Sequence, residues 1–426
     1  MKKTVYFLWF VLIGMNLAAQ SVWDGRREAI RNGSGTENDP YLIENAQNLA
    51  WLAYLVNWDY SHWTEGKYFL LTTDIDLNGS HDNQWIPIGS GPSADDTKFF
   101  KGIFDGGFHK ITGLYIDTNN PVDDNNSIWV TGYVGFFAQL GSQYDSKIKN
   151  LYLEGAINSK RKTGGFSGHQ GCFEYCINNV EVESSDNCAG GIVGLGPATV
   201  DNCANFGNIK GNQGVGGIVG FSGDVENCYN TGKIEGVDNV GGIAGRTLFA
   251  KNCYNVGDIV HGAGAVYKGG ITGNDPSGVH VYNCYYLEGC IDESNAFGEP
   301  KTVDFMRSQE FVNLLNNETD VWAYDENNTN NGYPVFGDTQ FAVNENFIEN
   351  TDLVTLYPNP GNSQFNISTD LQDASIKIYD INGKLVYNRQ FINNTTIYTA
   401  NWPYGIYLWK VISDGREVES GKWVKQ

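Results

Sequence analysis

The sequence predicts an all-β protein in which a right-handed parallel β-helix, or solenoid, with short helical caps precedes a small antiparallel β-sandwich. Composition is the first reason, because 52 Gly, 24 Tyr and 22 Phe with only three Met are typical of turn-rich β structure. The second is a repeat of about 25 residues through the middle of the chain. The third is a change near residue 353, after which short apolar segments alternate with turn residues.

The first twenty residues predict a secretory signal peptide. Lys2 and Lys3 precede an apolar run at residues 5–15, and small residues at 17–19 lead to an expected cleavage near Ser21. No later apolar run approaches the roughly 20 residues that cross a membrane. We therefore expect export through Sec and a mature chain with no transmembrane segment. The net charge of −21 repels phosphate backbones, which argues against nucleic acid as a partner.

Residues 21–68 are expected to form an N-terminal cap with one short helix. Asn45 is the predicted N-cap, and the apolar residues that follow it share one helical face. A solenoid needs such a cap because its first coil otherwise exposes a strand edge and an apolar end. The residues of that face are Ala46, Leu49, Ala50, Ala53 and Val56.

Cysteines mark the central repeat. Cys203, Cys228 and Cys253 are each 25 residues apart, while Cys176 precedes them by 27 and Cys284 follows by 31. A unit such as GGIVGFSGDVENC holds two or three brief strands and no helix of useful length. It cannot close a core alone and must stack on its neighbours. Each unit is therefore predicted to form one coil of a β-solenoid, with the five cysteines in a structural ladder.

Stacked coils lie about 4.8 Å apart, so residues at one register position form ladders. An apolar ladder is expected inside the coils and an amide ladder beside the cysteines. Glycine pairs are expected at corners that need positive φ or at points where backbones approach closely. The predicted ladders are Ile192, Ile218, Ile243 and Ile271; and Asn202, Asn227, Asn252 and Asn283. The pairs are 164–165, 190–191, 216–217, 241–242 and 269–270.

Eight cysteines in an exported chain first suggest disulfide bonds. Side chains in a ladder point the same way, however, so neighbouring Cβ atoms do not converge as a disulfide requires. Buried free thiols are therefore predicted for the five ladder cysteines. The states of Cys172, Cys188 and Cys290 stay open.

The units resemble GLUG repeats. The resemblance covers about residues 35–337, and it includes GYVGF at 132–136 and the opening segment FKGIFDGGFHKITGLYID at 100–117. It implies a solenoid over residues 69–298 and a C-terminal cap over 299–340, in which 306–315 is helix-like. A linker is expected at 341–352. GLUG repeats are associated with bacterial surface and adhesin-like proteins, and they specify architecture better than ligand.

Residues 353–426 predict a small antiparallel, Ig-like β-sandwich. IKIYDINGKLVY at 376–387 and WPYGIYLWKV at 402–411 alternate as strands do, and Asn382-Gly383 is a hairpin signal. The segment closely resembles the type A sorting domain of the type IX secretion system. That resemblance implies passage through the outer membrane by the type IX machinery, then release or surface attachment. It rests on Pro358, Asn359, Pro360, Gly405, Tyr407, Lys422 and Lys425.

Tryptophans of the mature chain cluster before residue 131, and none lies between there and residue 300. Aromatic platforms bind sugars, which makes Trp58, Trp63 and Trp85 candidate ligand-binding residues. The alternative is that these rings fill the core of the cap.

Asp74, Asp76 and Asn78 imitate the start of a calcium-binding loop. The twelfth position is Trp85 instead of a bidentate Glu, and apolar residues alternate with the acids as in a half-buried strand. These three residues are weak metal candidates, and no cofactor is expected.

Asp201 and Glu226 share one register in adjacent coils, which invites comparison with the paired carboxylates of glycosidases. Lys251 and Tyr282 continue that register, so the alternative is a mixed column facing solvent. The six histidines show no metal-ligand spacing. No catalytic residue is assigned.

We expect a secreted or cell-surface, non-enzymatic, adhesin-like protein that presents the solenoid to glycans or to extracellular proteins. Loops and strands of successive coils align into one extended surface, which suits binding. The alternatives are a polysaccharide-acting β-helix enzyme, either a lyase or a glycosidase, and a purely structural spacer.

Overall fold

The computed structural model divides the chain into two compact units, Met1–Asn344 and Glu345–Gln426. The expected signal peptide, residues 358–360 of the sorting motif and the expected hairpin at 382–383 lie outside the residues that the structure describes. The described residues are 21–58, 61–89, 98–119, 132–142, 145–273, 279–293, 295, 297–317, 319–337, 354–357, 362–369, 374–380, 384–392, 394–413 and 416–425.

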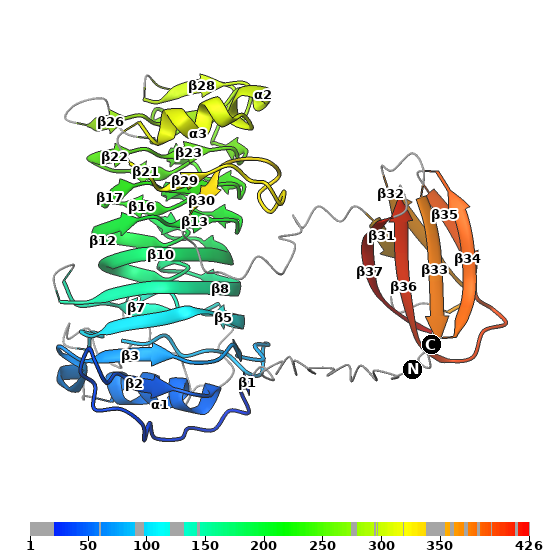
Figure 1. The fold of residues 1–426 in the computed structure, drawn as a ribbon, viewed down its shortest axis with the longest axis horizontal. Coiled ribbons are helices and arrows are strands. Elements are labelled where there is room, and N and C mark those ends of the chain that lie inside the picture. The colour runs from blue at the N-terminus through cyan, green and yellow to red at the C-terminus, as the bar shows by residue number, and fades with distance from the viewer. Residues whose placement is uncertain are drawn as a thin grey trace, which may run out of the picture. The chain divides into compact units, whose positions relative to one another are not determined.

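The first unit is a stack of strands that pair in parallel with the equivalent strands of neighbouring coils (Figure 1). Ala204 pairs with Tyr229 and Tyr229 with Tyr254, so the preceding cysteines occupy one column. The predicted β-solenoid is therefore confirmed. Its earlier coil strands are β5 (Ile103–Asp117), β6 (Tyr133–Val134), β7 (Phe137–Gln139), β8 (Lys147–Ser159), β9 (Lys162–Gly164), β10 (Ser167–Ser184), β11 (Ala189–Gly190), β12 (Val193–Asp201), β13 (Ala204–Asn205) and β14 (Ile209–Lys210).

The later coils repeat a simpler pattern of short strands. They are β15 (Gln213–Gly216), β16 (Val219–Phe221), β17 (Asp224–Glu226), β18 (Tyr229–Asn230), β19 (Ile234–Glu235), β20 (Asp238–Gly241), β21 (Ala244–Arg246), β22 (Phe249–Lys251), β23 (Tyr254–Asn255), β24 (Ile259–Val260), β25 (Lys268–Gly269), β26 (His280–Tyr282), β27 (Tyr285–Leu287) and β28 (Glu299–Lys301).

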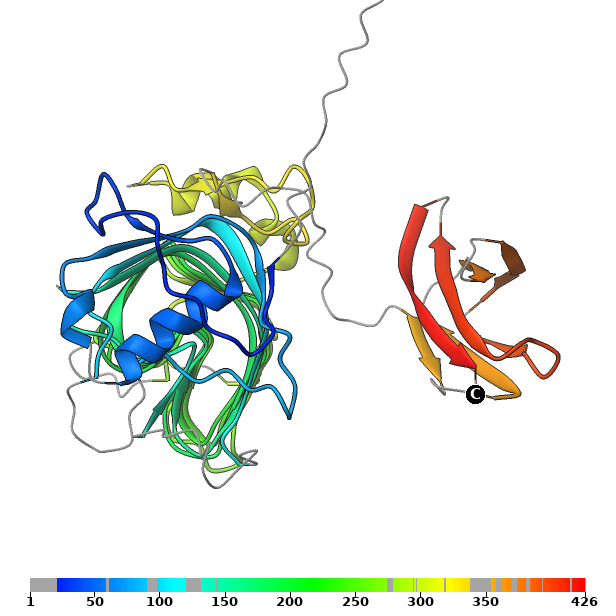
Figure 2. The same cartoon turned by 90° about the horizontal axis from the view of Figure 1, so that it is seen from below.

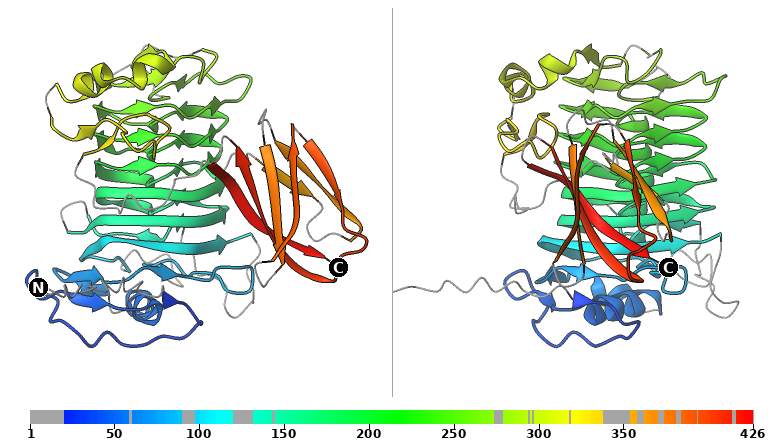
Figure 3. Two further views of the ribbon diagram at one scale, coloured as in Figure 1. Left: turned by 45° about the vertical axis from the view of Figure 1, so that its right-hand side comes forward. Right: turned by 90° about the vertical axis from the view of Figure 1, so that its right-hand side faces the viewer.

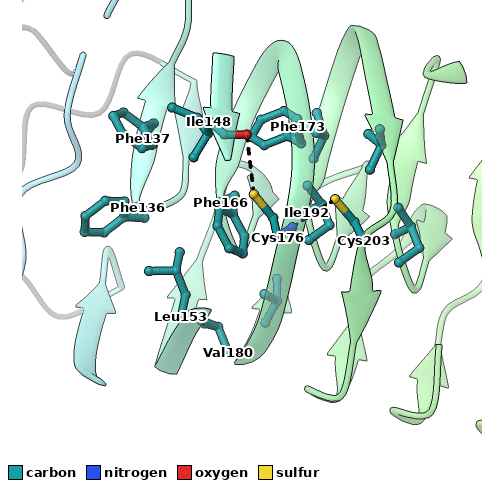
Figure 4. Close-up of a cluster of buried hydrophobic side chains, with 14 of the residues drawn as sticks. Phe136, Phe137, Ile148, Leu153, Phe166, Phe173, Cys176, Val180, Ile192 and Cys203 are labelled. Atoms are coloured by element: carbon teal, nitrogen blue, oxygen red, sulfur yellow. Dashed lines mark hydrogen bonds between the residues drawn. The ribbon is translucent and has the colours of Figure 1, made fainter. Parts of the chain in front are cut away.

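The interior of the stack is apolar, and the predicted isoleucine ladder is confirmed. Ile192, Ile218, Ile243 and Ile271 are all fully buried. Phe166 extends the ladder on one side, since its backbone N–H donates to the carbonyl of Ile192. Figure 4 shows Phe136, Phe166 and Ile192 in a row beside the cysteine column. Each buried large apolar side chain contributes about 2 kcal/mol to the free energy of folding.

The five ladder cysteines are buried free thiols, as predicted. The backbone N–H groups of Cys176, Cys203 and Cys228 each donate to the Sγ of the next ladder cysteine at 3.4 Å. The Cys176 thiol also lies 3.5 Å from the carbonyl oxygen of Ile148 (Figure 4). Burial raises the pKa of the Cys176 thiol, which therefore stays neutral. The three undecided cysteines, Cys172, Cys188 and Cys290, are unbridged too.

The left-handed corner of the coil falls on asparagine, not on the glycine pairs. Asn202, Asn227, Asn252 and Asn283 have φ values of 52, 51, 52 and 47°, whereas none of the paired glycines has positive φ. Asparagine tolerates this conformation best among residues with a side chain. The expected amide ladder forms above Asn227: Asn252 donates to Asn227 at 3.2 Å and Asn283 donates to Asn252 at 3.3 Å.

The glycine pairs mark close approach between coils, which was the second of the two expectations. A Cβ atom at Gly217 would lie 2.4 Å from the carbonyl oxygen of Gly242 and 2.4 Å from Cγ of Asn230. At Gly216 it would lie 2.3 Å from the carbonyl oxygen of Val219. Any side chain at these positions would push two coils apart.

Asn230 belongs to a second amide ladder that was not expected. Asn178, Asn205, Asn230 and Asn255 are fully buried. The first three each donate from Nδ2 to Oδ1 of the next at 2.7, 2.6 and 2.7 Å, and also to the carbonyl two residues ahead. Since a buried amide without partners costs about 1–3 kcal/mol, these hydrogen bonds fix the register of the coils. The exception is Oδ1 of Asn178 at the start of the row, which has no partner among the described residues.

The N-terminal end of the stack is covered by α1 (Ala46–Asn57), which lies across it in Figure 2. The predicted N-cap is confirmed, because the Asn45 side chain accepts from the backbone N–H of Asn48 at 2.8 Å. All five residues of the predicted apolar face are buried. The other elements here are β1 (Ser21–Val22), β2 (Tyr41–Ile43), the 3₁₀ helix η1 (Ser61–Thr64), β3 (Tyr68–Leu71) and β4 (Ile75–Asp76).

The segment after β28 covers a flank of the stack. It holds α2 (Val303–Met306), α3 (Gln309–Leu315) and the antiparallel pair β29 (Trp322–Ala323) and β30 (Val335–Phe336). The segment expected to be helix-like at 306–315 is helical from Gln309 to Leu315, and it is preceded by a separate short helix. Arg307 is the C-cap of α2 and Ser308 is the N-cap of α3. Tyr229 and Tyr254 stack at 5.1 Å along the flank, and Trp322 packs 5.9 and 5.4 Å from them.

The second unit is an antiparallel sandwich, as predicted, and both views in Figure 3 show its strands. Its sheets share one core that contains Phe365, Ile376, Trp409 and Trp423. One sheet has β31 (Val354–Tyr357), β32 (Gln364–Thr369) and β35 (Asn394–Tyr398). The other has the order β34 (Leu385–Phe391), β33 (Ala374–Asp380), β36 (Gly405–Ser413) and β37 (Arg416–Lys425).

Candidate functional site

One side of the solenoid presents two parallel columns of outward side chains, which we name the outer face. Strands β10, β12, β17, β22 and β26 supply them, and the residues between the columns point inward: Phe173, Val200 and Val225 are fully buried. The columns are Cys172, Thr199, Asp224, Phe249 and His280; and Glu174, Asp201, Glu226, Lys251 and Tyr282.

The N-terminal half of the outer face is charged and internally paired. Lys147 donates to Glu174 at 2.9 Å, and Lys251 lies 3.3 Å from Glu226. Asp201 lies between these pairs and accepts from Nδ2 of Asn227 at 2.9 Å. Burial, opposed by the Asn227 hydrogen bond, raises the pKa of Asp201 to about 6. The two carboxylates compared with glycosidase pairs are thus neighbours, and one of them carries an ion pair.

The C-terminal half of the outer face is aromatic. Tyr282 is 53% exposed, and its ring stacks 6.2 Å from His280 and lies 6.4 Å from Phe249. Next to it, the Arg246 guanidinium lies 5.0 Å from the centroid of the Phe221 ring. Exposed rings beside carboxylates offer both a flat apolar surface and hydrogen-bond acceptors.

The three tryptophan candidates do not form one site. Trp85 is 1% exposed, stacks 5.4 Å from Phe136 and donates to its carbonyl, so its ring has no face open to a ligand. Trp63 is half-buried and stacks 4.9 Å from Tyr41. Trp58 alone is well exposed, at 65%.

The two acids of the calcium-like motif, Asp74 and Asp76, form hydrogen bonds with other groups of the protein. Asp74 lies 2.9 Å from Nδ1 of His109 and accepts from the Lys110 backbone, while Asp76 accepts from the Asn78 backbone at 2.7 Å. Asn78 has a positive φ of 49°, in the left-handed region. Within the described part of the chain, no three His, Cys, Asp or Glu side chains converge to hold a metal ion.

The sorting-motif residues that the structure describes lie on β36 and β37. Tyr407 is buried and donates to the carbonyl of Pro403 at 2.8 Å, and Gly405 has a positive φ of 147°. The Lys425 ammonium is buried and donates to the carbonyl of Asn362, whereas Lys422 is exposed.

The chain thus combines a β-solenoid with a C-terminal antiparallel sandwich, and family models match a segment in each. The model for the secretion system C-terminal sorting domain matches residues 355–426. The model for the GLUG motif matches residues 211–235. The chain therefore carries a GLUG motif within its β-solenoid and a type IX sorting domain at residues 355–426, and the sorting domain implies interaction with the secretion machinery. In the regions described, no helix is long and apolar enough to cross a membrane.

Individual relatives resemble parts of the chain. A protein of Evansella cellulosilytica described as "Putative Gly-rich membrane protein" is 32% identical over 138 residues, which is 32% of this chain and 13% of that protein. Halomucin of Haloquadratum walsbyi is 27% identical over 197 residues, 45% of this chain. The chain thus spans 13% and 2% of the lengths of these two relatives.

A solved structure shares the fold. It is described as a "putative immunoglobulin A1 protease" from Bacteroides ovatus, with a TM-score of 0.53 and 23% identity over 73% of this chain and 95% of that one. At this level of identity the likeness concerns architecture alone.

Proposed function

We propose that this protein is a non-enzymatic, adhesin-like protein at the cell surface or in the medium, and that its outer face binds glycans. The observation that carries the proposal is the aromatic group formed by exposed His280 and Tyr282 and half-buried Phe249, which lies beside Glu226 and Lys251 on the outer face. Rings of this kind pack against the apolar faces of sugars, and the charged groups bond their hydroxyls. Export by the sorting domain brings such a face into contact with extracellular polymers.

Pairing within the charged half supports binding over catalysis. A glycosidase needs one carboxylic acid and one free carboxylate on either side of the scissile bond. Asp201 and Glu226 instead project from adjacent strands of one sheet, and Glu226 is paired with Lys251. The acidity of the column also favours neutral or amino sugars over polyanionic glycans.

The test is a glycan array with the mature full chain, run beside a polysaccharide degradation assay. We expect binding without turnover, and we expect Phe249→Ala with Tyr282→Ala to weaken it at least tenfold. Val266→Ala, at a 73% exposed site elsewhere, is the matched control and should bind normally. Loss of binding in Trp58→Ala alone would move the site to the N-terminal cap.

A polysaccharide-acting enzyme is the second candidate. One observation favours it, because a carboxyl group with a pKa of about 6 can hold a proton near neutral pH beside an ionised neighbour. Turnover that Asp201→Asn and Glu226→Gln each abolish would establish this function. If neither assay gives a signal, the alternative that remains is a purely structural spacer.

A further inference from the structure

The two columns of the outer face run along the solenoid axis beyond the five strands that define it. Ile103 on β5 pairs with Lys147 on β8, which in turn pairs with Cys172, so the first column continues onto both strands. Asp105 and Lys149 continue the second column in the same way. Strands β5, β8, β10, β12, β17, β22 and β26 lie one above another in Figure 1. Six steps of about 4.8 Å give the columns a length of about 29 Å.

One residue of each coil lies between the columns, and its side chain belongs to the core. Phe104, Ile148, Val200, Val225 and Ala250 hold this position and are fully buried. Only backbone therefore separates the two columns, whose Cα atoms lie about 6.6 Å apart on each strand. The step of about 4.8 Å between coils is close to the advance of one sugar residue along an extended glycan. A strip with this repeat matches a linear polymer, whereas a ligand held by one terminal sugar needs a concave pocket around it.

Most charged side chains of the columns are paired, and each pair joins two neighbouring coils. The pairs are Lys149 with Asp105 at 3.1 Å, Lys147 with Glu174 at 2.9 Å and Lys251 with Glu226 at 3.3 Å. Among the residues that the structure describes, Asp201 and Asp224 are the acids of the columns that have no such cation partner. The strip therefore carries little net charge, and the charge that remains is acidic. It suits an uncharged polymer and repels a polyanion.

We propose that the outer face binds an internal segment of a linear, uncharged polysaccharide, which lies along the solenoid axis with about one sugar residue over each coil. This inference rests on the proposed function and adds the form and the direction of the ligand. The rings of Tyr282 and Phe249, 6.4 Å apart in neighbouring coils, hold the first two sugars. Exposed Asp224 and Thr199 follow in the next two coils and bond hydroxyl groups. A chain of three sugars that starts at Tyr282 ends at Asp224, and only a longer chain reaches Thr199.

The first test is calorimetric titration of the mature full chain with cello-, manno-, malto- and chito-oligosaccharides of three and six sugars. A hexasaccharide offers four registers to a site for three sugars, so a gain of up to fourfold needs no further contact. We expect the hexasaccharide of the recognised series to bind at least thirtyfold more tightly than the trisaccharide. A gain of fourfold or less overturns this inference and leaves the proposed function standing. If no oligosaccharide of either length binds, the proposed function fails and this inference fails with it.

A variant far from the rings tests the direction of the chain. Thr199→Val removes one hydroxyl and should weaken hexasaccharide binding at least threefold, with trisaccharide binding unchanged. Valine keeps β propensity, and an unchanged thermal midpoint shows that the coil still folds. Thr36→Val, at an exposed position of the N-terminal cap, is the matched control and should bind both lengths normally. An equal loss for both lengths would place Thr199 in a compact site, and no loss for either would show that the chain does not reach it. Both results contradict a ligand that lies along the axis.

Discussion

Asp201 belongs to a column of the outer face and also accepts a hydrogen bond from the asparagine column beside it. Asn227 donates to the Asp201 carboxylate at 2.9 Å and not to Asn202, although Asn202 is its neighbour in the amide column. Nδ2 of Asn202 also donates to Asp201, at 3.4 Å, while its Oδ1 is buried with no hydrogen-bond partner among the described residues. The carboxylate therefore takes the acceptor position that an amide fills in later coils. Because burial raises its pKa, this position stabilises the protonated acid relative to the ion.

The stability of the protein should therefore depend on Asp201 above pH 4. In the unfolded chain this acid titrates near 3.8 and in the folded chain near 6, so between these values only the folded state keeps the proton. The corresponding stability is present below pH 4 and is lost as the pH rises to 6. We expect Asp201→Asn to raise the free energy of unfolding by about 1 kcal/mol at pH 8, discounted for solvent screening of a partly exposed side chain.

Urea unfolding at pH 8 and pH 3.5 measures this effect, with the gain expected at pH 8 alone. Asp224→Asn, at an exposed position of the same outer face, is the control and should show no such difference. An equal gain at both pH values would contradict the assignment.

For single residues, the sequence predicted which positions line up between coils, but it did not predict the structural role of every such row. Ile218 and Cys228 follow a fixed spacing, and their types are those of an interior. Asn230 follows the same spacing, yet asparagine is ordinarily a surface residue, so its fully buried ladder was missed. The recurring Asn two residues after each of the first four ladder cysteines was the available signal. The aromatic half of the outer face was missed because Phe249, His280 and Tyr282 do not repeat.

The coil is the element on which the glycine pairs act. Gly217 has no Cβ to separate its coil from the carbonyl of Gly242 and from Asn230. Gly217→Val should therefore lower the free energy of unfolding by about 3 kcal/mol or more, since backbone and a hydrogen-bonded amide cannot yield as a flexible side chain can.

Thermal and urea unfolding of the purified chain check this. Gly264→Val is the matched control, because no atom lies within 4 Å of a Cβ placed there and its φ is not positive. If both variants unfold together with the parent, the proposed register of the coils is wrong.

The flanking segment is a second element with a measurable contribution. Trp322 is 3% exposed and packs on Tyr229, Tyr254 and Phe336. Trp322→Ala should cost about 3–5 kcal/mol by leaving a cavity over the tyrosine column. Tyr324→Ala, two residues away at 44% exposure, should cost less than about 1 kcal/mol.

Near-UV circular dichroism and urea unfolding of the two variants separate the effects. A Trp322→Ala chain as stable as Tyr324→Ala would show that the segment does not stabilise the stack. The sequence indicated helix near 306–315 but not the break at residues 307–308, because whether a serine between polar residues caps a new helix depends on tertiary packing.

For the whole molecule, architecture was predictable and the binding surface was not. Because the repeat places equivalent residues in successive coils, the spacing alone predicts a solenoid. The alternation of short apolar segments with turn residues predicts the sandwich. A surface arises only when register brings side chains of different coils together. Phe221 and Tyr282, for example, are 61 residues apart in the sequence. Their separation by only two coils becomes known once the coils are stacked.

Among the residues that the structure describes, the apolar cores of the two units share none. Removing residues 345–426 should therefore leave the solenoid of the mature chain folded, with a urea midpoint within about 0.3 M of its transition in the full chain, since stability resides in contacts between neighbouring coils. The same truncation should remain in the periplasm, because the sorting domain is gone. Fractionation of cells, with the parent chain as control, gives the readout. An extracellular truncated chain would show that export does not depend on this domain, and an unfolded one would show that the solenoid needs it for stability.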